Sequence, residues 1–308
     1  ICGSSLATAA TMSKVAMPPM RKYGYQDSLA AASIAAGGTL GILIPPSVML
    51  VVYGLLTETS IRELFAAGLV PGILGVVLYL VAVRWTVYRQ PTMAPPMERV
   101  PWPQRLIALK GVLSTIALFI LVMGGIYAGA FTPTEAAGIG AAGALLIAMM
   151  KRAITVKVLH EILLDSAKTT GVLFSVVISA LIFSNFINRS GFTNQLLELI
   201  TSMNMAPFMV IIAIICVYIV LGCIFESMSM LLLTVPIFFP LVESLGYDLV
   251  WFGILVVVVT EISLITPPVG MNVFVLSGVV KDIKTKTIFK GIIPFWTVDM
   301  LRLALVAL

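Results

Sequence analysis

Two apolar runs in this chain are each broken by a Pro-Pro pair, and this feature restricts the fold more than any other. Residues 39–52 read TLGILIPPSVMLVV, and residues 260–275 read TEISLITPPVGMNVFV. Proline removes a backbone N–H and clashes with the carbonyl four residues earlier, so a helix opens at such a pair. At membrane depth, freed backbone groups are tolerated only where protein or a water-filled cavity covers them. Each break is therefore expected to line a site.

Composition indicates that the chain lies in a membrane. Of its 308 residues, 60% are hydrophobic and 11% are charged, whereas a soluble domain is usually about 25% charged. A membrane-spanning helix needs about 20 mostly apolar residues, so we expect an all-α polytopic membrane protein. The expected elements are spans near 64–88, 107–130, 134–150, 168–188 and 288–308, a leg at 3–20 that ends at Pro18 and Pro19, and interrupted runs at 28–57, 206–243 and 250–278.

The two broken runs belong to an internal repeat with an offset of 222 residues, the separation of Pro45 from Pro267. Rare residues coincide at this offset without a gap. They are Pro18 with Pro240, Gly24-Tyr25 with Gly246-Tyr247, and Pro45-Pro46 with Pro267-Pro268. Coincident apolar residues, such as Val51 with Val273, carry no weight in so apolar a chain.

Basic residues orient the chain. Counting the predicted spans puts all but three of the 19 Lys and Arg residues on one side, the exceptions being Arg62, Arg189 and Arg302. By the positive-inside rule this side is the cytoplasm, which leaves the C-terminus periplasmic. The two broken runs then cross in opposite directions, so the repeats are inverted. Inverted repeats with discontinuous helices are typical of secondary transporters. The net charge of +5 reflects this topology and gives no reason to expect nucleic-acid binding.

Oxygen atoms are the predicted ligands at both breaks. Gly37 and Gly38 precede the first Pro-Pro pair and allow an unwound backbone there. Each break brings together freed backbone carbonyls, the negative end of a half-helix and nearby hydroxyl groups. Together these groups suit a small cation such as Na⁺. The hydroxyls are those of Ser4, Ser5 and Thr39 in the first repeat, and of Ser227, Ser229, Ser263 and Thr266 in the second.

Five segments along the chain resemble the motifs of one family. ICGSSLATAATMSKVAMPPM, GGTLGILIPPSVMLVVYGLLTETSI, FTPTEAA, ESMSMLLLTVPIFFPL and LITPPVGMNVFV are similar to the large membrane (permease) subunit of tripartite ATP-independent periplasmic (TRAP) transporters. The resemblance implies an elevator-type, Na⁺-coupled importer of organic acids (C4-dicarboxylates, sialic acid or other carboxylates) in the bacterial inner membrane. It implies Na⁺ as the coupling ion, with no cofactor. The implied partners are a small membrane subunit, a periplasmic substrate-binding protein and the lipid bilayer.

The resemblance also divides the chain into functional segments. It implies a first transport-domain repeat at 1–61, scaffold and connecting helices at 62–188, a second transport-domain repeat at 189–279, and a cytoplasmic arm with a final helix at 280–308. Each transport repeat would contain a re-entrant hairpin and a discontinuous helix. Because the sequence opens on Ile1 and lacks the first leg of hairpin one, we expect a fragment cut inside a structural element.

Matched residue by residue, each hairpin tip and its neighbouring break would hold one Na⁺, with the substrate between the tips. The expected sodium ligands are Ser4, Ser5, Gly38, Thr39 and Pro45 at the first site, and Glu226, Ser227, Ser229, Thr266 and Gly270 at the second. The expected substrate-binding residues are Arg189, Ser5, Ser47 and Asn272.

Three charged residues allow two interpretations each. An acidic side chain at the membrane centre costs about 2.5 to 3.5 kcal/mol, so Glu226 is either an ion ligand or a cap for helix N–H groups. Glu261, which aligns with Thr39 across the repeats, is either a ligand or a contact to a neighbouring helix. Arg189 either grips a substrate carboxylate or snorkels at a helix end.

Two other classes compete with the transporter. A channel, or another Na⁺/anion symporter that works without a binding protein, would also use broken helices. Continuous pores usually carry rings of charge or carbonyls, however, and this chain has few membrane charges. We do not expect an enzyme, because the sequence has no Gly-rich phosphate loop, no HExxH motif and no Ser/His/Asp constellation.

Overall fold

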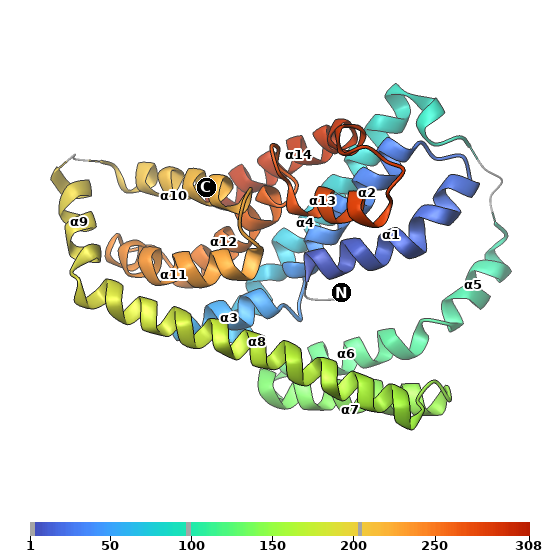
Figure 1. Cartoon of the computed structure of the whole chain (residues 1–308), viewed down its shortest axis with the longest axis horizontal. Coiled ribbons are helices and arrows are strands. Elements are labelled where there is room, and N and C mark those ends of the chain that lie inside the picture. The colour runs from blue at the N-terminus through green and yellow to red at the C-terminus, as the bar shows by residue number, and fades with distance from the viewer. Residues whose placement is uncertain (1–3, 97–99, 203–204) are drawn as a thin grey trace. The chain divides into compact units, whose positions relative to one another are not determined.

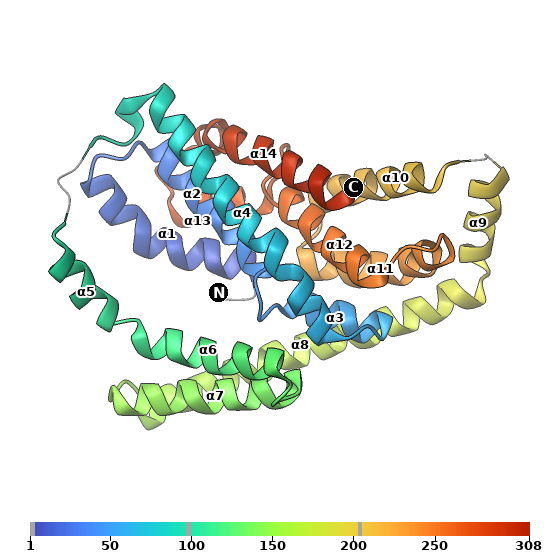
Figure 2. The same cartoon turned by 180° about the vertical axis from the view of Figure 1, so that it is seen from behind.

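A computed structural model describes residues 4–96, 100–202 and 205–308, and all the secondary structure in these ranges is helical (Figures 1 and 2). The helices are α1 (Ser5–Lys22), α2 (Asp27–Thr39), the 3₁₀ turn η1 (Leu40–Ile42), α3 (Val48–Thr57), α4 (Ile61–Arg89), η2 (Pro91–Met93), α5 (Trp102–Lys110), α6 (Leu113–Ala128), α7 (Pro133–Met150), α8 (Val156–Arg189), α9 (Phe192–Ser202), α10 (Pro207–Gly222), α11 (Ser227–Ser244), α12 (Leu249–Ser263), α13 (Met271–Val279) and α14 (Thr285–Ala307). The chain forms two compact units, Ile1–Pro96 with Ala180–Leu308, and Met97–Ser179.

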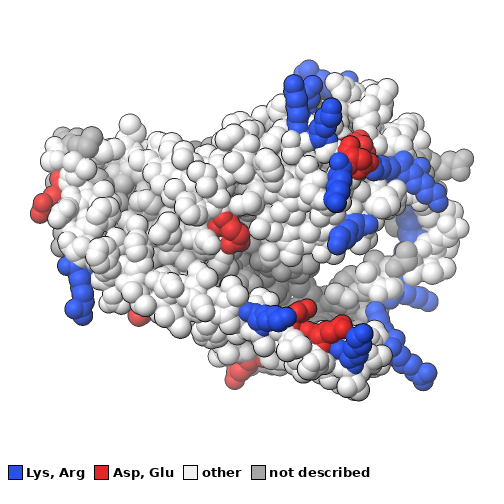
Figure 3. Space-filling view, viewed as in Figure 1, with Lys and Arg blue, Asp and Glu red and all other residues white. Residues whose placement is uncertain are grey.

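Four helices in the described ranges are long and apolar enough to cross a membrane, namely α4, α7, α8 and α11. Shorter apolar helices include α3, α6, α10 and α12. The prediction of an all-α chain with several apolar membrane helices is confirmed. Much of one face carries no charged side chain, as Figure 3 shows, and large apolar side chains such as Val70 and Leu80 on α4 are exposed.

Several predicted boundaries differ from the structure. The span expected at 107–130 is divided between α5 and α6. The leg expected to end at Pro18 and Pro19 continues through both prolines to Lys22. The polar segment before residue 168, expected as a loop, is helical from Val156 onward and continuous with the apolar span. Charged and polar residues such as Lys and Glu are good helix formers, so a change in polarity along α8 does not end the helix.

Both interrupted runs open where the sequence predicts. After α2 the backbone tightens into η1 and leaves the helix until α3 begins. Helices α12 and α13 are separated by turns at residues 264–270, without a 3₁₀ helix. The Pro45–Pro46 and Pro267–Pro268 peptide bonds are both cis.

The internal repeat is visible in the bounds of the helices. Adding 222 to the bounds of α1 gives those of α11. Each of these helices contains a proline at the matched position and is followed, two residues after its end, by a glycine with positive φ, Gly24 at 75° and Gly246 at 81°. The N–H of Gly24 bonds to the Arg21 carbonyl and that of Gly246 to the Glu243 carbonyl, each at 2.9 Å. The Gly-Tyr turn predicted in both repeats is confirmed.

The register changes by one residue after the prolines. Ser47 is the N-cap of α3 and Gly270 is the N-cap of α13, an offset of 223. The second break is therefore one residue longer than the first. Val273 consequently matches Leu50 and not Val51, in agreement with the decision to discount the apolar coincidences.

Helix packing in the larger unit follows the repeat. Leg α1 packs against α2 and against α13, while leg α11 packs against α12 and against α3. Each leg thus contacts the helix before its own break and the helix after the other repeat's break. Helix α14 packs against α2 and α4, and a buried cluster that includes Ala31, Ala35, Ile292 and Phe295 fills the space around α2.

Candidate functional site

The start of α1, which the resemblance matches to the first hairpin tip, lies directly on the first opened helix. Ser4 caps α1, its Oγ accepting from the N–H of Ala7 at 3.4 Å. The next residue, Ser5, is buried, and its hydroxyl has no hydrogen-bond partner among the described residues. A Cβ placed on Gly38 would lie 3.3 Å from the Ser5 carbonyl oxygen and 3.4 Å from the amide nitrogen of Ala9. The lack of a side chain at Gly38 allows this close approach.

Inside the first break, several polar groups are already paired. Thr39 is fully buried, and its hydroxyl donates to the Ala36 carbonyl at 2.8 Å. The Ser47 hydroxyl donates to the Ile42 carbonyl and accepts from the N–H of Leu50 at 3.2 Å. Pro45 is buried beside them. Because the Thr39 and Ser47 hydroxyls are already hydrogen-bonded, the remaining candidate ligands at this break are backbone carbonyl oxygens.

The second tip is capped by its acidic residue. Glu226 Oε2 accepts from the N–H of Met228 at 2.9 Å and from that of Ser229 at 3.3 Å, while Oε1 accepts from the Ser227 hydroxyl at 2.9 Å. Ser227 is buried and Ser229 is exposed. Of the two interpretations of Glu226, the structure therefore shows the geometry of the helix cap.

The second tip also meets the second opened helix. Cys223 Sγ lies 3.8 Å from the carbonyl oxygen of Thr266 and 3.9 Å from that of Pro267. The Thr266 hydroxyl donates to the Ile262 carbonyl at 2.6 Å and accepts from Trp296 Nε1 at 3.0 Å. Gly270, at φ 57°, starts α13 in a left-handed conformation that favours glycine.

One side chain joins the two breaks, and one candidate lies apart from them. Asn272, fully buried after the second break, donates from Nδ2 to the Ala35 carbonyl on α2 at 3.1 Å, and its Oδ1 has no partner in the described ranges. Arg189 is exposed at the end of α8 and has no hydrogen bond or ion pair with any described residue. The structure brings Ser5 together with Gly38 and joins Asn272 to α2, but it does not bring Arg189 to them.

The chemistry available at both tips is that of oxygen ligands. Hydroxyls and carbonyls are hard ligands that suit small cations. Within the described ranges, no group of three or more His, Cys, Asp or Glu side chains has the geometry to hold a metal ion. Gly3, which the resemblance also matches to the first hairpin tip, lies outside the described residues.

The described residues form an all-helical structure with several apolar helices and two opened helices, one contacted by the start of α1 and the other by the turn before α11. These are the features of a polytopic membrane protein. Its sequence matches, over residues 1–308, the model of the family described as "Tripartite ATP-independent periplasmic transporter, DctM component". The chain belongs to this family, the large permease subunits of TRAP transporters.

Characterised relatives differ in the substrates that their names record. The chain is 38% identical over 285 residues to the C4-dicarboxylate TRAP transporter large permease protein DctM of Pseudomonas aeruginosa, covering 91% of this chain and 65% of that protein. It is 32% identical to the sialic acid TRAP transporter large permease protein SiaM of Vibrio cholerae, covering 99% of this chain and 71% of the relative. It is also 32% identical to the ectoine TRAP transporter large permease protein TeaC of Halomonas elongata, covering 100% and 72%. The chain thus spans about two thirds of the length of these relatives.

Sequence reasoning missed two contacts at this site. Cys223 is not among the predicted ligands, although it follows Gly222 at the predicted interruption. Trp296 approaches Thr266 from α14, and nothing local in the sequence indicates that contact. For Glu261, the alternative of a contact to a neighbouring helix is confirmed, because its carboxylate pairs with Arg302 on α14.

Proposed function

We propose that this chain is part of a Na⁺-coupled secondary importer of organic acids, which a periplasmic binding protein delivers and which cross by an elevator movement. Family membership supports transport with a small membrane subunit and a binding protein. The names of the relatives, which include C4-dicarboxylate and sialic acid transporters, support carboxylate substrates. The observation that most supports this proposal is that the start of α1 and the turn before α11 each contact an opened helix. The contacts are those of Ser5 with Gly38 and of Cys223 with Thr266.

In this proposal, the two repeats are inverted in the membrane and their hairpins are re-entrant. One Na⁺ is held near Ser5 and Gly38 by carbonyls and the free Ser5 hydroxyl. A second is held near Ser227 by the carbonyls of Thr266 and the residues that follow it. The substrate lies between the tips, where Ser47 and Asn272 border the breaks, and the exposed Arg189 meets the carboxylate during delivery.

The test is uptake into proteoliposomes that contain the full permease with its small subunit, with labelled C4-dicarboxylates and sialic acid as probes. We expect saturable uptake that needs both an inward Na⁺ gradient and the binding protein. An ion current that persists without the binding protein would support a channel instead. Na⁺-driven uptake without it would support another kind of symporter.

A matched pair of variants locates the first ion. Gly38→Ala puts a methyl group against the Ser5 carbonyl, while Gly37→Ala points into open space, with nothing within 4 Å. We expect Gly38→Ala to raise the Na⁺ concentration for half-maximal uptake at least several-fold, and Gly37→Ala to leave it unchanged. Equal behaviour of the two variants would place the ion elsewhere.

A further inference from the structure

Two apolar grooves run along the exposed face of α14. The first, here called the break groove, has a volume of about 410 Å³ and is lined by residues that include Phe289 and Trp296. The second, the α4 groove, has a volume of about 400 Å³ and is lined in part by Trp85 on α4. Both grooves are lined by Ile293 and Thr297, which are exposed, so they lie on either side of one ridge of α14.

Basic side chains lie at one end of this ridge. Lys286 and Lys290 precede Ile293 and Thr297 with spacings of four, three and four residues, and all four side chains are exposed. Such spacings place the four residues on one face of the helix. Figures 1 and 3 together show basic side chains gathered over the start of α14. The ridge is therefore cationic at its start and then apolar beside the grooves.

Helix α4 adds a third cation at the same end. Tyr79 contacts Asp299, and Trp85 lies beside Ile293 in the α4 groove, so α4 and α14 run antiparallel. Arg89 therefore lies one turn beyond Trp85, toward the start of α14, with its guanidinium 4.7 Å from the centroid of the Trp85 ring. Tryptophan is enriched at membrane–water interfaces, and basic residues are enriched in the cytoplasmic loops beside them. This end of the grooves is thus at the level of the lipid headgroups.

Two apolar grooves that share a cationic end match one kind of molecule. Neither Lys286 nor Lys290 forms an ion pair with a described residue, so both can bind an anion. A transmembrane helix fits less well, because helix interfaces in membranes use small residues, whereas Ile293 and Trp85 are bulky. We propose that the grooves hold the two acyl chains of an anionic phospholipid, whose phosphate is bound by Lys286, Lys290 and Arg89.

The break groove reaches the second opened helix. Its lining residue Trp296 donates from Nε1 to the Thr266 hydroxyl at 3.0 Å. Phe289, another lining residue, packs against the N-cap of α13, since a Cβ on Gly270 would lie 3.0 Å from Phe289 Cε1. An acyl chain in this groove therefore contacts two of the side chains that pack on the second break.

Quenching of tryptophan fluorescence by brominated lipids tests this proposal independently of transport. The full permease with its small subunit is placed in phosphatidylcholine nanodiscs that contain a small fraction of a lipid with brominated chains, either phosphatidylglycerol or phosphatidylcholine. Bromine quenches on contact, so Trp85 and Trp296 report occupancy of the grooves. In the wild type, we expect the excess quenching by the anionic lipid to be about two-fold, because basic clusters at the cytoplasmic surface attract anionic headgroups.

Charge variants identify the headgroup contacts. In Lys286→Gln/Lys290→Gln, the two brominated lipids should quench equally. The matched control is Lys157→Gln/Lys168→Gln, which removes two exposed lysines from α8 and should quench like the wild type. Equal quenching by both lipids in the wild type would overturn the proposal, and that comparison needs no variant. An excess that survives Lys286→Gln/Lys290→Gln would overturn it too.

A second pair of variants separates the chains from the headgroup. Thr297→Phe puts an exposed ring between the grooves without altering the lysines, so it should abolish the excess quenching. Leu305→Phe, at an exposed position of α14 outside both grooves, should keep it. If Thr297→Phe keeps the excess, or if inorganic phosphate removes it from the wild type, the site binds only a phosphate group and the proposed lipid site is wrong.

Discussion

Asn272 Nδ2 donates to the carbonyl oxygen of Ala35 at 3.1 Å, a contact between residues 237 positions apart that ties the end of the second break to the helix before the first. Asn272 is fully buried. The bond fixes one opened helix relative to the other, so we infer that the two breaks are held as a single rigid core.

Replacing Asn272 should therefore lower stability. Asn272→Ala removes a buried hydrogen bond, for which the expected loss is about 1–3 kcal/mol. Asn185 makes the same kind of bond on the surface of α8, from Nδ2 to the Leu181 carbonyl at 3.0 Å. Asn185→Ala should change stability by less than about 0.5 kcal/mol. Melting curves of the two variants in detergent make the comparison, and equal losses would contradict a special role for Asn272.

The close packing of Arg302 against α4 predicts a large effect of a single methyl group. Gly75→Ala overpacks the contact with Arg302 and Leu40, and overpacking typically costs about 1–3 kcal/mol. Gly171→Ala, at a helical position with nothing within 4 Å, should be neutral or slightly stabilising, since Ala favours helix. Thermal unfolding measures both. An unaffected Gly75→Ala variant would show that α4 and α14 are further apart.

The cap geometry at Glu226 predicts that its Ala and Gln variants differ in stability. Glu226→Ala removes the acceptor for two N–H groups and should cost about 1 kcal/mol. Glu226→Gln retains an acceptor oxygen, so it should keep most of the stability and the Na⁺ dependence of uptake. If Glu226→Gln instead melts normally but no longer responds to Na⁺, Glu226 is an ion ligand.

An ion cluster at the turns predicts a pH dependence. Arg21 Nε lies 2.7 Å from Asp27 Oδ1, and Arg21 Nη2 lies 2.6 Å from Oδ2 of Asp282, which follows α13. The guanidinium lowers the pKa of Asp282 below its ordinary value. A lowered folded-state pKa stabilises the protein above the unfolded pKa of about 3.9, and the effect is lost as the pH falls through the folded value.

The wild type should therefore melt slightly above Asp282→Asn at pH 8 and at pH 6, by the same margin. The margin should shrink below about pH 4. Both residues are partly exposed, so the margin should also fall in high salt. A margin that grows on acidification would rule out the ion pair as its source.

Local signals in the sequence predicted the opened helices well. The proline pairs and the Gly-Tyr pairs act through the backbone of their own segment, so their effect can be inferred without knowing their neighbours. Pro18 shows the limit of such reasoning, because α1 continues past it into a last turn that packing supports.

Contacts between distant helices were beyond the sequence pattern. Asp299 and Arg302, three residues apart in an apolar helix, signal a buried function, but their partners Glu261 and Tyr79 lie on other helices. Likewise, the burial of the Ser5 hydroxyl and the packing of Gly38 against the Ser5 carbonyl depend on how α1 lies on α2. The sequence indicates which residues are unusual, whereas the packing decides which of them meet.

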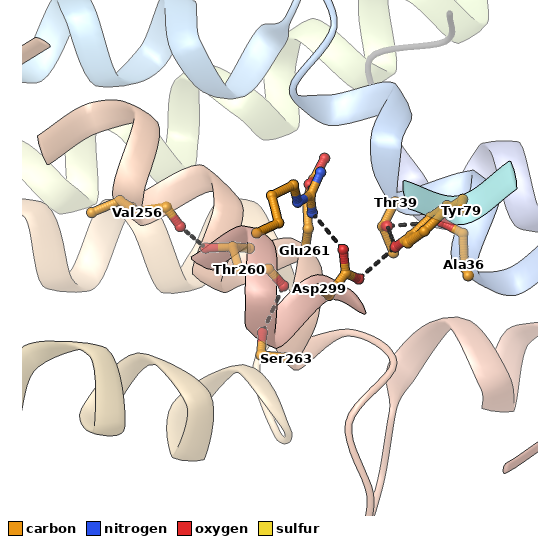
Figure 4. A network of polar contacts seen from close by, with 9 residues as sticks. Ala36, Thr39, Tyr79, Val256, Thr260, Glu261, Ser263 and Asp299 are labelled. Carbon is orange, nitrogen blue, oxygen red and sulfur yellow. Dashed lines mark hydrogen bonds and ion pairs between the residues drawn. The ribbon is translucent and has the colours of Figure 1, made fainter. Parts of the chain in front are cut away.

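The one-residue change in register has a consequence for the buried polar contacts among Thr39, Tyr79, Glu261 and Arg302 (Figure 4). Thr39 matches Glu261 at the offset of 222, and Tyr79 matches Arg302 at 223, so the Thr39–Tyr79 contact and the Glu261–Arg302 ion pair are the same contact made once in each copy. Asp299 bridges them. Two identical halves would place either four hydroxyls or two complete ion pairs here. The unequal halves instead meet as a hydroxyl pair and an ion pair. Asp299 adds a carboxyl group on one side only, because the position that matches it at the offset of 223 is Val76.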